Sequence, residues 1–546
     1  MPPYAAMSDI CDVIVLGSGA AGLTAALAAH ESGADVRVIE RFDRIGGTSA
    51  VSGGVIWVAD NPRQRAAGLT DSRAEALAYF RSLDHGDLRD DVLEAFVDTG
   101  PEALGFLEDI DALRVSLLAG YPDYYLDRPG AKPEGGRALD HDLFALGELG
   151  KWATRIYEIE EPKPIMLRET ALGGGSGVVP TDELHRRIAA DERGFGQAMI
   201  GRLLKACLAR GIEPVLGVQT KRLTRDGGRI TGIEGARNGE PFALSARHGV
   251  IGATGGFEWD AGLRQTFLRG PADTPASPPT ARGEGLALAM AAGASLGNMT
   301  SAWWAPTLAP PGETWPGAEQ RAAPVLIERT VPHGLMVNRA GLRFCNEAAN
   351  YSALAGAFHA FDPQTYSYRN QPAWLVFDAQ YRARYPIGTV LPSAPLPDWV
   401  HRADTLEALA GKLGIDGPAL TATVARFNAF ARDGHDPDFA RGTSAYDHFY
   451  GDRSRAGTAV TLGPLEQAPF HAVEIRMGVL GTNGGPRTDA AARILDHAGK
   501  PIPGLFGAGN AIACPTGGIY AGAGGTLGPA LTFGYIAGRS AARANV

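Results

Sequence analysis

The sequence contains little cysteine and no cluster of basic residues. Its four cysteines, Cys11, Cys207, Cys345 and Cys514, are too far apart for a zinc knuckle or a CxxC redox pair. The 51 lysines and arginines stand against 60 acidic residues, a net charge of −9, so nucleic-acid binding is not expected. The 12 histidines form no HxxxH motif, so no metal site is predicted.

No basic segment precedes the first apolar run, as it would in a secretory signal. With so few cysteines, this favours a reducing, cytoplasmic setting. Charged residues are also absent from Pro501 to Gly538, a stretch long enough to cross a membrane. Eleven of its residues are glycine and several are proline, and in lipid such broken backbone would leave polar groups unpaired. We therefore expect a buried segment that contacts a cofactor, and no transmembrane span.

Glycine is abundant, at 72 of 546 residues, and shows no three-residue period of the collagen type. Eight glycines lie from Gly17 to Gly54 and eleven from Gly504 to Gly538. An interior glycine costs chain entropy on folding, so it is expected where the backbone needs a conformation or a close approach that other residues do not allow. We expect the backbone in both stretches to approach a dinucleotide too closely for a side chain.

The first stretch has the pattern of a dinucleotide-binding unit. Residues 12–16 (DVIVL) predict a buried parallel strand, and GSGAAG at 17–22 opens an alanine-rich helix that ends near Gly33. A second strand at 35–40 ends in Glu40, which can accept hydrogen bonds from a ribose diol. The helix N-terminus would face the phosphates.

Two further segments favour FAD over NAD. Glycines and hydroxyl residues at 46–49 and 52–54 suit a large flat ligand, and the pattern resembles FAD enzymes of the glutathione-reductase-like class. Near the C-terminus, a strand ending in 504–510 precedes a helix that begins near Thr526, with Pro529 in its first turn. The positive end of that helix would favour an anionic reduced flavin.

The rest of the chain predicts a second domain. The sequence predicts helical stretches at 197–210, a hairpin at 219–236 and a buried strand at 248–256. Near Thr280 the composition of the chain changes. A helix at 283–294 is followed by loops rich in proline and aromatic residues. We predict an α/β fold: a Rossmann-like FAD-binding domain of the glutathione-reductase type (1–280 and 462–546) with an inserted α+β catalytic, or cap, domain (281–461).

Over nearly its whole length the chain resembles the 3-ketosteroid Δ1-dehydrogenase branch of the fumarate-reductase-like flavoproteins. The matching segments are GGTSAVSGGVIWVADN (46–61), YPDYY (121–125), ATGGFEWD (253–260), GNMTSAWW (297–304), RFCNEAANY (343–351) and GGIYAGAGGTLGPALTFGYIAG (517–538). The resemblance implies an FAD enzyme that introduces a double bond beside the ketone of a cyclic, steroid-like substrate. It also implies an external electron acceptor, a quinone or a carrier protein.

The resemblance assigns roles to four residues. Tyr520 O–H and Gly524 N–H would clamp the carbonyl oxygen, Tyr351 would remove the α-proton, and the β-hydride would pass to flavin N5. Tyr124 would support Tyr351, with Tyr121 and Tyr125 as alternatives. A phenol has a pKa of about 10, so a base of this kind needs a hydrogen bond to its ionised form or a positive field.

The predicted FAD contacts follow the motifs above. They are Gly17, Gly19, Ala20, Ala21, Gly22, Glu40, Arg41, Gly47, Thr48, Ser49, Ser52, Gly53, Gly54, Ala253, Thr254, Gly255, Gly509, Asn510, Gly525, Thr526 and Leu527.

Three other interpretations stay open. A fumarate-type or enoate reductase is disfavoured because Asn350 stands where relatives often carry arginine, and because 510–525 lacks histidine and arginine to hold a dicarboxylate. A dehydrogenase of a smaller cyclic ketone and a flavin-bearing binding protein are the others.

Two groups of residues have roles that the sequence leaves less defined. Trp303 and Trp304, with Met299 and Leu308, either line a hydrophobic substrate cleft or only pack the second domain. Arg343, Asn346 and Glu347 are expected to brace the loop that carries Tyr351.

Overall fold

The computed structural model describes residues 10–158, 163–317 and 319–544. Its first sheet has the strand order β2-β1-β10-β23-β22. Strands β1 (Ile10–Leu16), β2 (Val36–Ile39), β10 (Glu240–Gly252) and β23 (Pro501–Gly507) are parallel, and β22 (Arg493–Leu495) closes one edge antiparallel. The hairpin of β8 (Val218–Asp226) and β9 (Arg229–Arg237) extends from β10.

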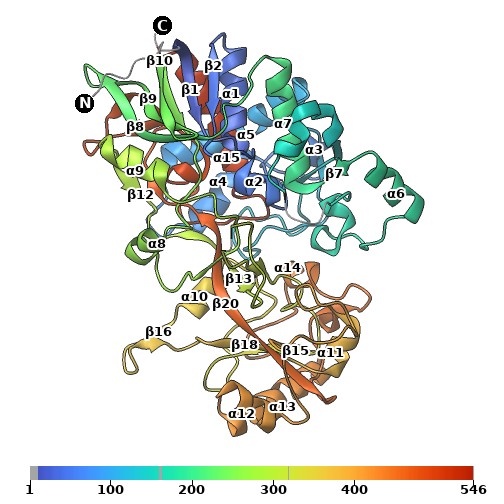
Figure 1. Ribbon diagram of the computed structural model, residues 1–546. Helices are drawn as coiled ribbons and strands as arrows, with labels where there is room; N and C mark the ends of the chain where they lie inside the picture. Colours follow the sequence, from blue (N-terminus) through green and yellow to red (C-terminus); the bar gives the residue numbers. More distant parts are fainter. Residues whose placement is uncertain (1–9, 159–162, 318, 545–546) are drawn as a thin grey trace.

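Helices α1 (Ala20–Glu31) and α15 (Leu527–Ala542) pack together beside this sheet (Figure 1). All residues from Ala20 to Ala29 are buried, as their small side chains allow. A Cβ on Gly534 or Gly538 of α15 would lie 2.5 or 2.3 Å from the carbonyl oxygen of Ala21 or Ala25. These two glycines serve helix packing, whereas the sequence pattern predicted cofactor contact for the whole stretch.

A second sheet lies below the first in Figure 1, in the order β14-β13-β20-β18-β15. Its members are β13 (Ala302–Leu308), β14 (Ala323–Pro324), β15 (Gly334–Val337), β18 (Ala373–Phe377) and the long β20 (Phe470–Thr482), with β11 (Thr274–Pro275) and β19 (His401–Ala403) also paired to β20. Helices α12 (Leu406–Leu413) and α13 (Gly417–Asp433) cover the outer end of this sheet.

The second sheet does not fit the predicted domain limits. Strand β20 lies in the predicted C-terminal part of the FAD-binding domain, and β11 lies before residue 281, yet both pair within the second sheet. We therefore propose that the inserted domain extends from about Thr274 to Thr482. The aromatic stretch expected to be a loop is also a fully buried strand, β13.

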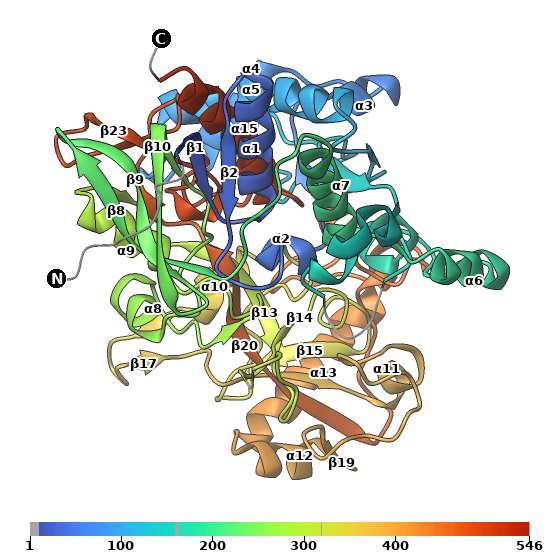
Figure 2. The same ribbon diagram turned by 45° about the horizontal axis from the view of Figure 1, so that its top comes forward.

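The remaining predicted elements form close to their expected positions. Helix α7 (Phe195–Ala209), the turn Gly227–Gly228 between β8 and β9, and α9 (Glu284–Ala291) match the sequence pattern. Figure 2 shows α7 packed beside α1, while α6 (Thr181–Ala189) projects from the body.

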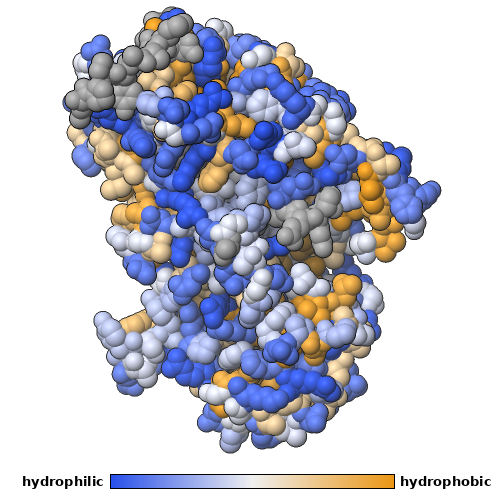
Figure 3. All heavy atoms as spheres, viewed as in Figure 1, coloured by the Kyte–Doolittle hydropathy of each residue, from blue (hydrophilic) through white to orange (hydrophobic). Residues whose placement is uncertain are grey.

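The face drawn in Figure 3 is mainly hydrophilic, with smaller apolar patches. Among the described residues, no helix is both long and apolar enough to cross a bilayer.

Candidate active site

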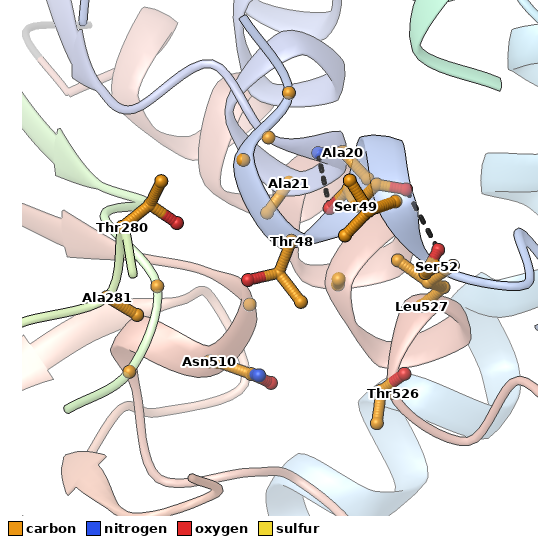
Figure 4. A pocket seen from close by; sticks show the side chains of 18 of the residues that line it. Ala20, Ala21, Thr48, Ser49, Ser52, Thr280, Ala281, Asn510, Thr526 and Leu527 are labelled. Atoms are coloured by element: carbon orange, nitrogen blue, oxygen red, sulfur yellow. Dashed lines mark hydrogen bonds between the residues drawn. The ribbon is translucent and has the colours of Figure 1, made fainter. Parts of the chain in front are cut away.

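A cavity of about 490 Å³ runs from the glycine-rich turn after β1 to a group of buried tyrosines. Of the residues predicted to contact FAD, all line it except Gly22 and Gly525. Of the four predicted catalytic residues, Tyr351, Tyr520 and Gly524 line it and Tyr124 does not. The structure therefore gathers segments from both ends of the chain around one space (Figure 4).

The turn after β1 shows why its glycines are needed. Gly17 has φ +103°, and a Cβ there would lie 2.3 Å from the carbonyl oxygen of Ala253. A Cβ on Gly22 would lie 2.0 Å from the oxygen of Gly17, so Gly22 lets α1 start close to β1. The first turn of α1 has no acidic residue, and its N-terminus opens toward the cavity at Gly19 and Ala20. A helix N-terminus of this kind could hold the pyrophosphate of a dinucleotide.

Glu40, at the end of β2, is positioned by Ser18. Its Oε2 accepts hydrogen bonds from Ser18 N at 3.0 Å and Ser18 Oγ at 2.5 Å, and its Oε1 accepts one from Phe42 N at 3.0 Å. Burial raises the pKa of Glu40, against these hydrogen bonds. The carboxylate lines the cavity beside the phosphate site, where an adenosine ribose needs an acceptor.

The second glycine segment packs directly against this turn. It forms the short helix α2 (Gly47–Val51), and Ser49 Oγ accepts a hydrogen bond from Ala20 N at 3.2 Å (Figure 4). A Cβ on Gly53 would meet no atom within 4 Å, so Gly53 borders open space. Thr48 lines the same wall.

Helix α15 begins at the cavity. Thr526 and Leu527 line it, and the first turn has no acidic residue, so the positive end of the helix acts on whatever the cavity holds. With the phosphate site and Glu40, this makes a long, glycine-walled cavity that fits FAD along its length.

Three tyrosines from distant segments meet beyond this part of the cavity. The ring centroids of Tyr124, Tyr351 and Tyr520 are 5.2 to 5.5 Å apart in each pair. Tyr124 Oη donates a hydrogen bond to Tyr351 Oη at 2.6 Å. Tyr124 N also donates to Ala521 O at 3.0 Å, which ties the Tyr124 segment to the Tyr520 loop. The resemblance favoured Tyr124 over Tyr121 and Tyr125 of YPDYY, and Tyr124 is the one whose hydroxyl contacts Tyr351.

Burial is the largest influence on the pKa values of these tyrosines. It raises the pKa of Tyr351 well above its usual value, and the other buried tyrosines around it act in the same direction. The hydrogen bond from Tyr124 is the influence that lowers the pKa of Tyr351. Burial also raises the pKa of Tyr520. Tyr351 therefore accepts the hydrogen bond that would stabilise its phenolate, while its buried surroundings raise its pKa.

Tyr520 and Gly524 lie on the loop before α15. Gly524 has φ +88°, and a Cβ there would lie 2.5 Å from the carbonyl carbon of Ile56. Trp57 N donates to the carbonyl of Gly524 at 3.2 Å, which fixes this peptide against β3 (Ile56–Trp57). The ring of Tyr520 packs edge-on against Trp303 at 4.9 Å between centroids. Both residues face the same cavity.

The residues before Tyr351 form a buried charge network outside the cavity. Glu347 accepts hydrogen bonds from Arg343 and from Arg441, and Arg343 also bonds Asp436. Asn350 Nδ2 donates to Tyr124 O at 3.2 Å, so it joins the two tyrosine segments. Asn346 Nδ2 donates to the carboxylate of Asp447 at 2.9 Å. These side chains brace the loop and do not line the cavity, as expected.

The two tryptophans of β13 separate, because successive side chains of a strand point to opposite faces. Trp303 lines the cavity, and its Nε1 donates to Asn510 Oδ1 at 3.1 Å. Trp304 lies in the core of the second domain with Leu308 and Met299, so only Trp303 can contribute to a cleft.

Several cavity residues have no signal in the sequence. They are Tyr450, Phe195, Leu172 and Lys163, which complete the wall at the tyrosine end, where Tyr450 is hydrogen-bonded to Tyr121 of YPDYY. None of these four belongs to a motif, so only the fold brings them together.

Comparison with known proteins agrees with this geometry. The family model described as "FAD binding domain" matches residues 12–527. The chain is 42% identical to 4-oxocyclohexanecarboxylate 2-dehydrogenase of Sinomonas cyclohexanicum, over 97% of this chain and 92% of that one. It is 35% identical to 3-oxosteroid 1-dehydrogenase of Mycobacterium tuberculosis, over 96% of this chain and 97% of that one.

A solved structure of a related enzyme has the same fold over nearly the whole chain. The 3-ketosteroid Δ1-dehydrogenase from Sterolibacterium denitrificans, in complex with 1,4-androstadiene-3,17-dione, superimposes with a TM-score of 0.89 at 34% identity. The match covers 98% of this chain and all of that one. The chain therefore belongs to the FAD-binding family of flavoproteins, with the fold of the fumarate reductase and steroid dehydrogenase type, and its cofactor is FAD.

Proposed function

We propose that the protein is an FAD-dependent dehydrogenase of cyclic ketones, which introduces a C=C bond next to the carbonyl group. The observation that carries this proposal is the contact of Tyr124, Tyr351 and Tyr520 at the end of a cavity that fits FAD. Relatives with 42% and 35% identity act on a cyclohexanone acid and on 3-oxosteroids.

Tyr520 and Gly524 polarise the ketone in this mechanism. The Tyr520 hydroxyl and the Gly524 N–H donate to the carbonyl oxygen and stabilise the negative charge that develops as the α-proton leaves. The contact with Trp303 orients the Tyr520 ring, and the left-handed conformation of Gly524 sets the direction of its peptide.

Tyr351 takes the α-proton. Its phenolate is stabilised by the hydrogen bond from Tyr124, which acts through Tyr351 and does not line the cavity. Bound FAD supplies the acceptor for the β-hydride. The electrons then leave to an external acceptor, a quinone or a carrier protein, in keeping with the resemblance.

A fumarate-type reductase is the less favoured function. Among the described residues, no arginine or histidine lines the tyrosine end of the cavity, where a dicarboxylate would need two cationic partners. Asn350 is used to join the Tyr124 and Tyr351 segments.

The test is anaerobic reduction of the FAD-loaded protein by a panel of ketones. The panel contains 4-oxocyclohexanecarboxylate, cyclohexanone and 4-androstene-3,17-dione, with product mass measured after each reaction. Loss of the oxidised-flavin absorbance, with a product lacking two hydrogens, supports the proposal. Flavin that no ketone reduces would show a different function, and fumarate reduction by the reduced protein would favour the reductase.

A further inference from the structure

We propose that Asp123 is a positioning residue, whose buried carboxylate fixes the carbonyl clamp of Tyr520 O–H and Gly524 N–H relative to the proton-accepting pair. That pair is Tyr351 with its support Tyr124. This inference rests on the proposed function, because the clamp and the base act in the same reaction. Asp123 does not line the cavity, so it acts through the residues that it holds.

Asp123 is joined to the clamp loop through Trp57 of β3. It directly precedes Tyr124 in the chain and is buried. Its Oδ1 accepts a hydrogen bond from Trp57 Nε1 at 3.0 Å. The backbone N–H of the same tryptophan donates to Gly524 O at 3.2 Å. One tryptophan therefore contacts the aspartate through its ring and the clamp through its backbone.

Gly522 shows how closely the clamp loop packs on this hydrogen bond. A Cβ there would lie 2.9 Å from Cδ1 and Nε1 of Trp57 and 3.2 Å from Oδ1 of Asp123. A larger residue would displace one of the two partners, so the loop rests on the hydrogen-bonded pair itself. Because Gly522 lies midway between Tyr520 and Gly524, a shift of the pair is passed to the clamp.

The two residues after Asp123 are attached to the same loop. Tyr124 N donates to Ala521 O at 3.0 Å, and Tyr79 Oη donates to the same oxygen at 2.8 Å. Tyr79 Oη also accepts a hydrogen bond from Tyr125 N at 3.1 Å. Three consecutive residues, from Asp123 to Tyr125, are therefore tied to the clamp loop, and Asp123 is the charged one.

The carboxylate of Asp123 is held from its other side by Arg137. Arg137 Nη1 donates to Asp123 Oδ2 at 2.7 Å, and Lys132 N donates to the same oxygen at 3.0 Å. The guanidinium also donates twice to Asp71, at 2.8 and 2.6 Å, and its Cζ lies 5.2 Å from the ring centroid of Trp57. Charge-assisted hydrogen bonds are short and directional, so they fix Asp123 in one orientation.

The reaction needs this precision at two points at once. The clamp has to meet the ketone oxygen while the base meets the α-hydrogen, and a misplacement of about 1 Å can cost about 100-fold in rate. The clamp and the base come from distant segments of the chain. Asp123 adjoins Tyr124 in sequence and contacts the clamp through Trp57, so it is the point at which the two are joined.

The experiment measures anaerobic flavin reduction against pH, with the panel ketone that reduces the wild-type flavin fastest. Each variant gives a limiting rate at high pH and a midpoint. W57F removes the Nε1 donor and keeps the backbone N–H. D123N keeps the size of the side chain, but its amide cannot accept hydrogen bonds from both Trp57 and Arg137. The ionisable groups that face Tyr351 are the same in both variants; they are Tyr124, Tyr446, Tyr450 and Tyr520.

Two matched controls lose the same groups elsewhere. W259F loses an indole N–H that donates to Ser277 O at 3.0 Å, and D378N loses a buried carboxylate that accepts from Gln380 N at 2.9 Å. Neither Trp259 nor Asp378 lines the cavity. FAD content and Tm, measured for every variant, separate a loss of folding from a loss of position.

W57F should lower the limiting rate by about 10- to 100-fold with little change of midpoint, because the clamp moves while Arg137 still holds Asp123. D123N should lower it by a similar factor and also raise the midpoint by about one pH unit, because the Tyr124 hydroxyl is no longer directed at the Tyr351 oxygen. Removal of a negative charge alone would lower the pKa of Tyr351, so the direction of the shift distinguishes positioning from charge. Both controls should match wild type.

The outcomes separate this inference from the proposed function. A D123N protein with full FAD and an unchanged or lowered midpoint would overturn the inference, and so would W57F with the wild-type limiting rate. In either case the dehydrogenase function stands. If D123N does not retain FAD, the limiting rate of W57F decides. If no ketone reduces the wild-type flavin, the proposed function fails, and the inference fails with it.

Discussion

Tyr124 donates a hydrogen bond to Tyr351 across 2.6 Å, although the two residues are 227 positions apart in the sequence. Both hydroxyl groups are buried, and burial raises the pKa of each tyrosine well above its usual value. A donor aimed at the Tyr351 oxygen stabilises the phenolate more than the phenol. The pair is thus arranged to make Tyr351 the stronger acid and Tyr124 its support.

Removing the Tyr124 hydroxyl should weaken the base. In Y124F the pKa of Tyr351 rises further, so a smaller fraction is ionised at neutral pH, and the limiting rate of flavin reduction should fall by about 10- to 100-fold. The rate should recover toward higher pH, with its midpoint shifted upward relative to wild type. The measurement is the pH profile of anaerobic flavin reduction.

The control for this variant is Y385F. Tyr385 Oη donates to Asp452 in the second domain, outside the cavity, so this variant also loses one hydrogen-bonded hydroxyl. Its pH profile should match that of wild type. A Y124F profile that also matches wild type would mean that Tyr124 does not tune Tyr351.

The Tyr520 hydroxyl should stabilise the transition state more than the bound ketone. Y520F should therefore lower kcat by about 10²- to 10³-fold, with a smaller change in KM. FAD content, read from the flavin-to-protein absorbance ratio, should stay at the wild-type value. A Y520F enzyme with full FAD and the wild-type kcat would remove Tyr520 from the carbonyl clamp.

Glu40 should contribute to FAD affinity. In E40A the cavity loses the carboxylate that Ser18 and Phe42 hold in place, and the Kd for FAD should rise by about 10- to 100-fold. Fluorescence titration of FAD-free protein measures this Kd. The matched control is E31A, since Glu31 pairs with Arg210 at the far end of α1. Equal FAD affinity of E40A and E31A would contradict the ribose assignment.

Glu347 should stabilise the second domain in a pH-dependent way. Burial raises its pKa, but Arg343 and Arg441 outweigh this and lower the pKa to about 2. Because the folded pKa lies below the unfolded value of about 4.5, the stabilisation is present at neutral pH and is lost as pH falls from about 4.5 toward 2.

The variant E347Q tests this network. It leaves two buried arginines with a neutral partner and should lose about 3–5 kcal/mol at pH 7. Thermal unfolding should show a large Tm difference from wild type at pH 7 that narrows below pH 4. A Tm difference that stays constant from pH 7 to pH 3 would show that the charge of Glu347 does not carry the stabilisation.

The sequence predicts the parts of this site that local backbone geometry dictates. GSGAAG and Glu40 need one strand, one turn and one helix, and their spacing alone predicted the turn and the strand end that line the cavity. Gly534 shows where this kind of prediction fails. A glycine in the same stretch was expected to contact the cofactor, but Gly534 allows close packing of two helices. Trp303 and Trp304 were considered together, as cleft residues or as packing residues, because a loop was expected where the strand β13 forms.

Other contacts depend on the tertiary fold. The resemblance favoured Tyr124 and kept Tyr121 and Tyr125 as alternatives, and the packing of that loop on Ala521 is what brings Tyr124 to Tyr351. Lys163 and Phe195 lie in segments without any motif, and they join the cavity because Gly194 contacts the backbone of Ile165. The pairing of β20 is also tertiary, since its partners β13 and β18 lie more than ninety residues earlier in the chain, and no sequence pattern indicated it.

The most direct test of the account is a single turnover of Y351F beside wild type, both loaded with FAD and mixed anaerobically with 4-oxocyclohexanecarboxylate. Wild type should lose the oxidised-flavin absorbance and release a product that lacks two hydrogens. Y351F should bind FAD equally but reduce it about 10²- to 10⁴-fold more slowly, because the α-proton has no base. Flavin reduction by Y351F at the wild-type rate would contradict the proposed role of Tyr351.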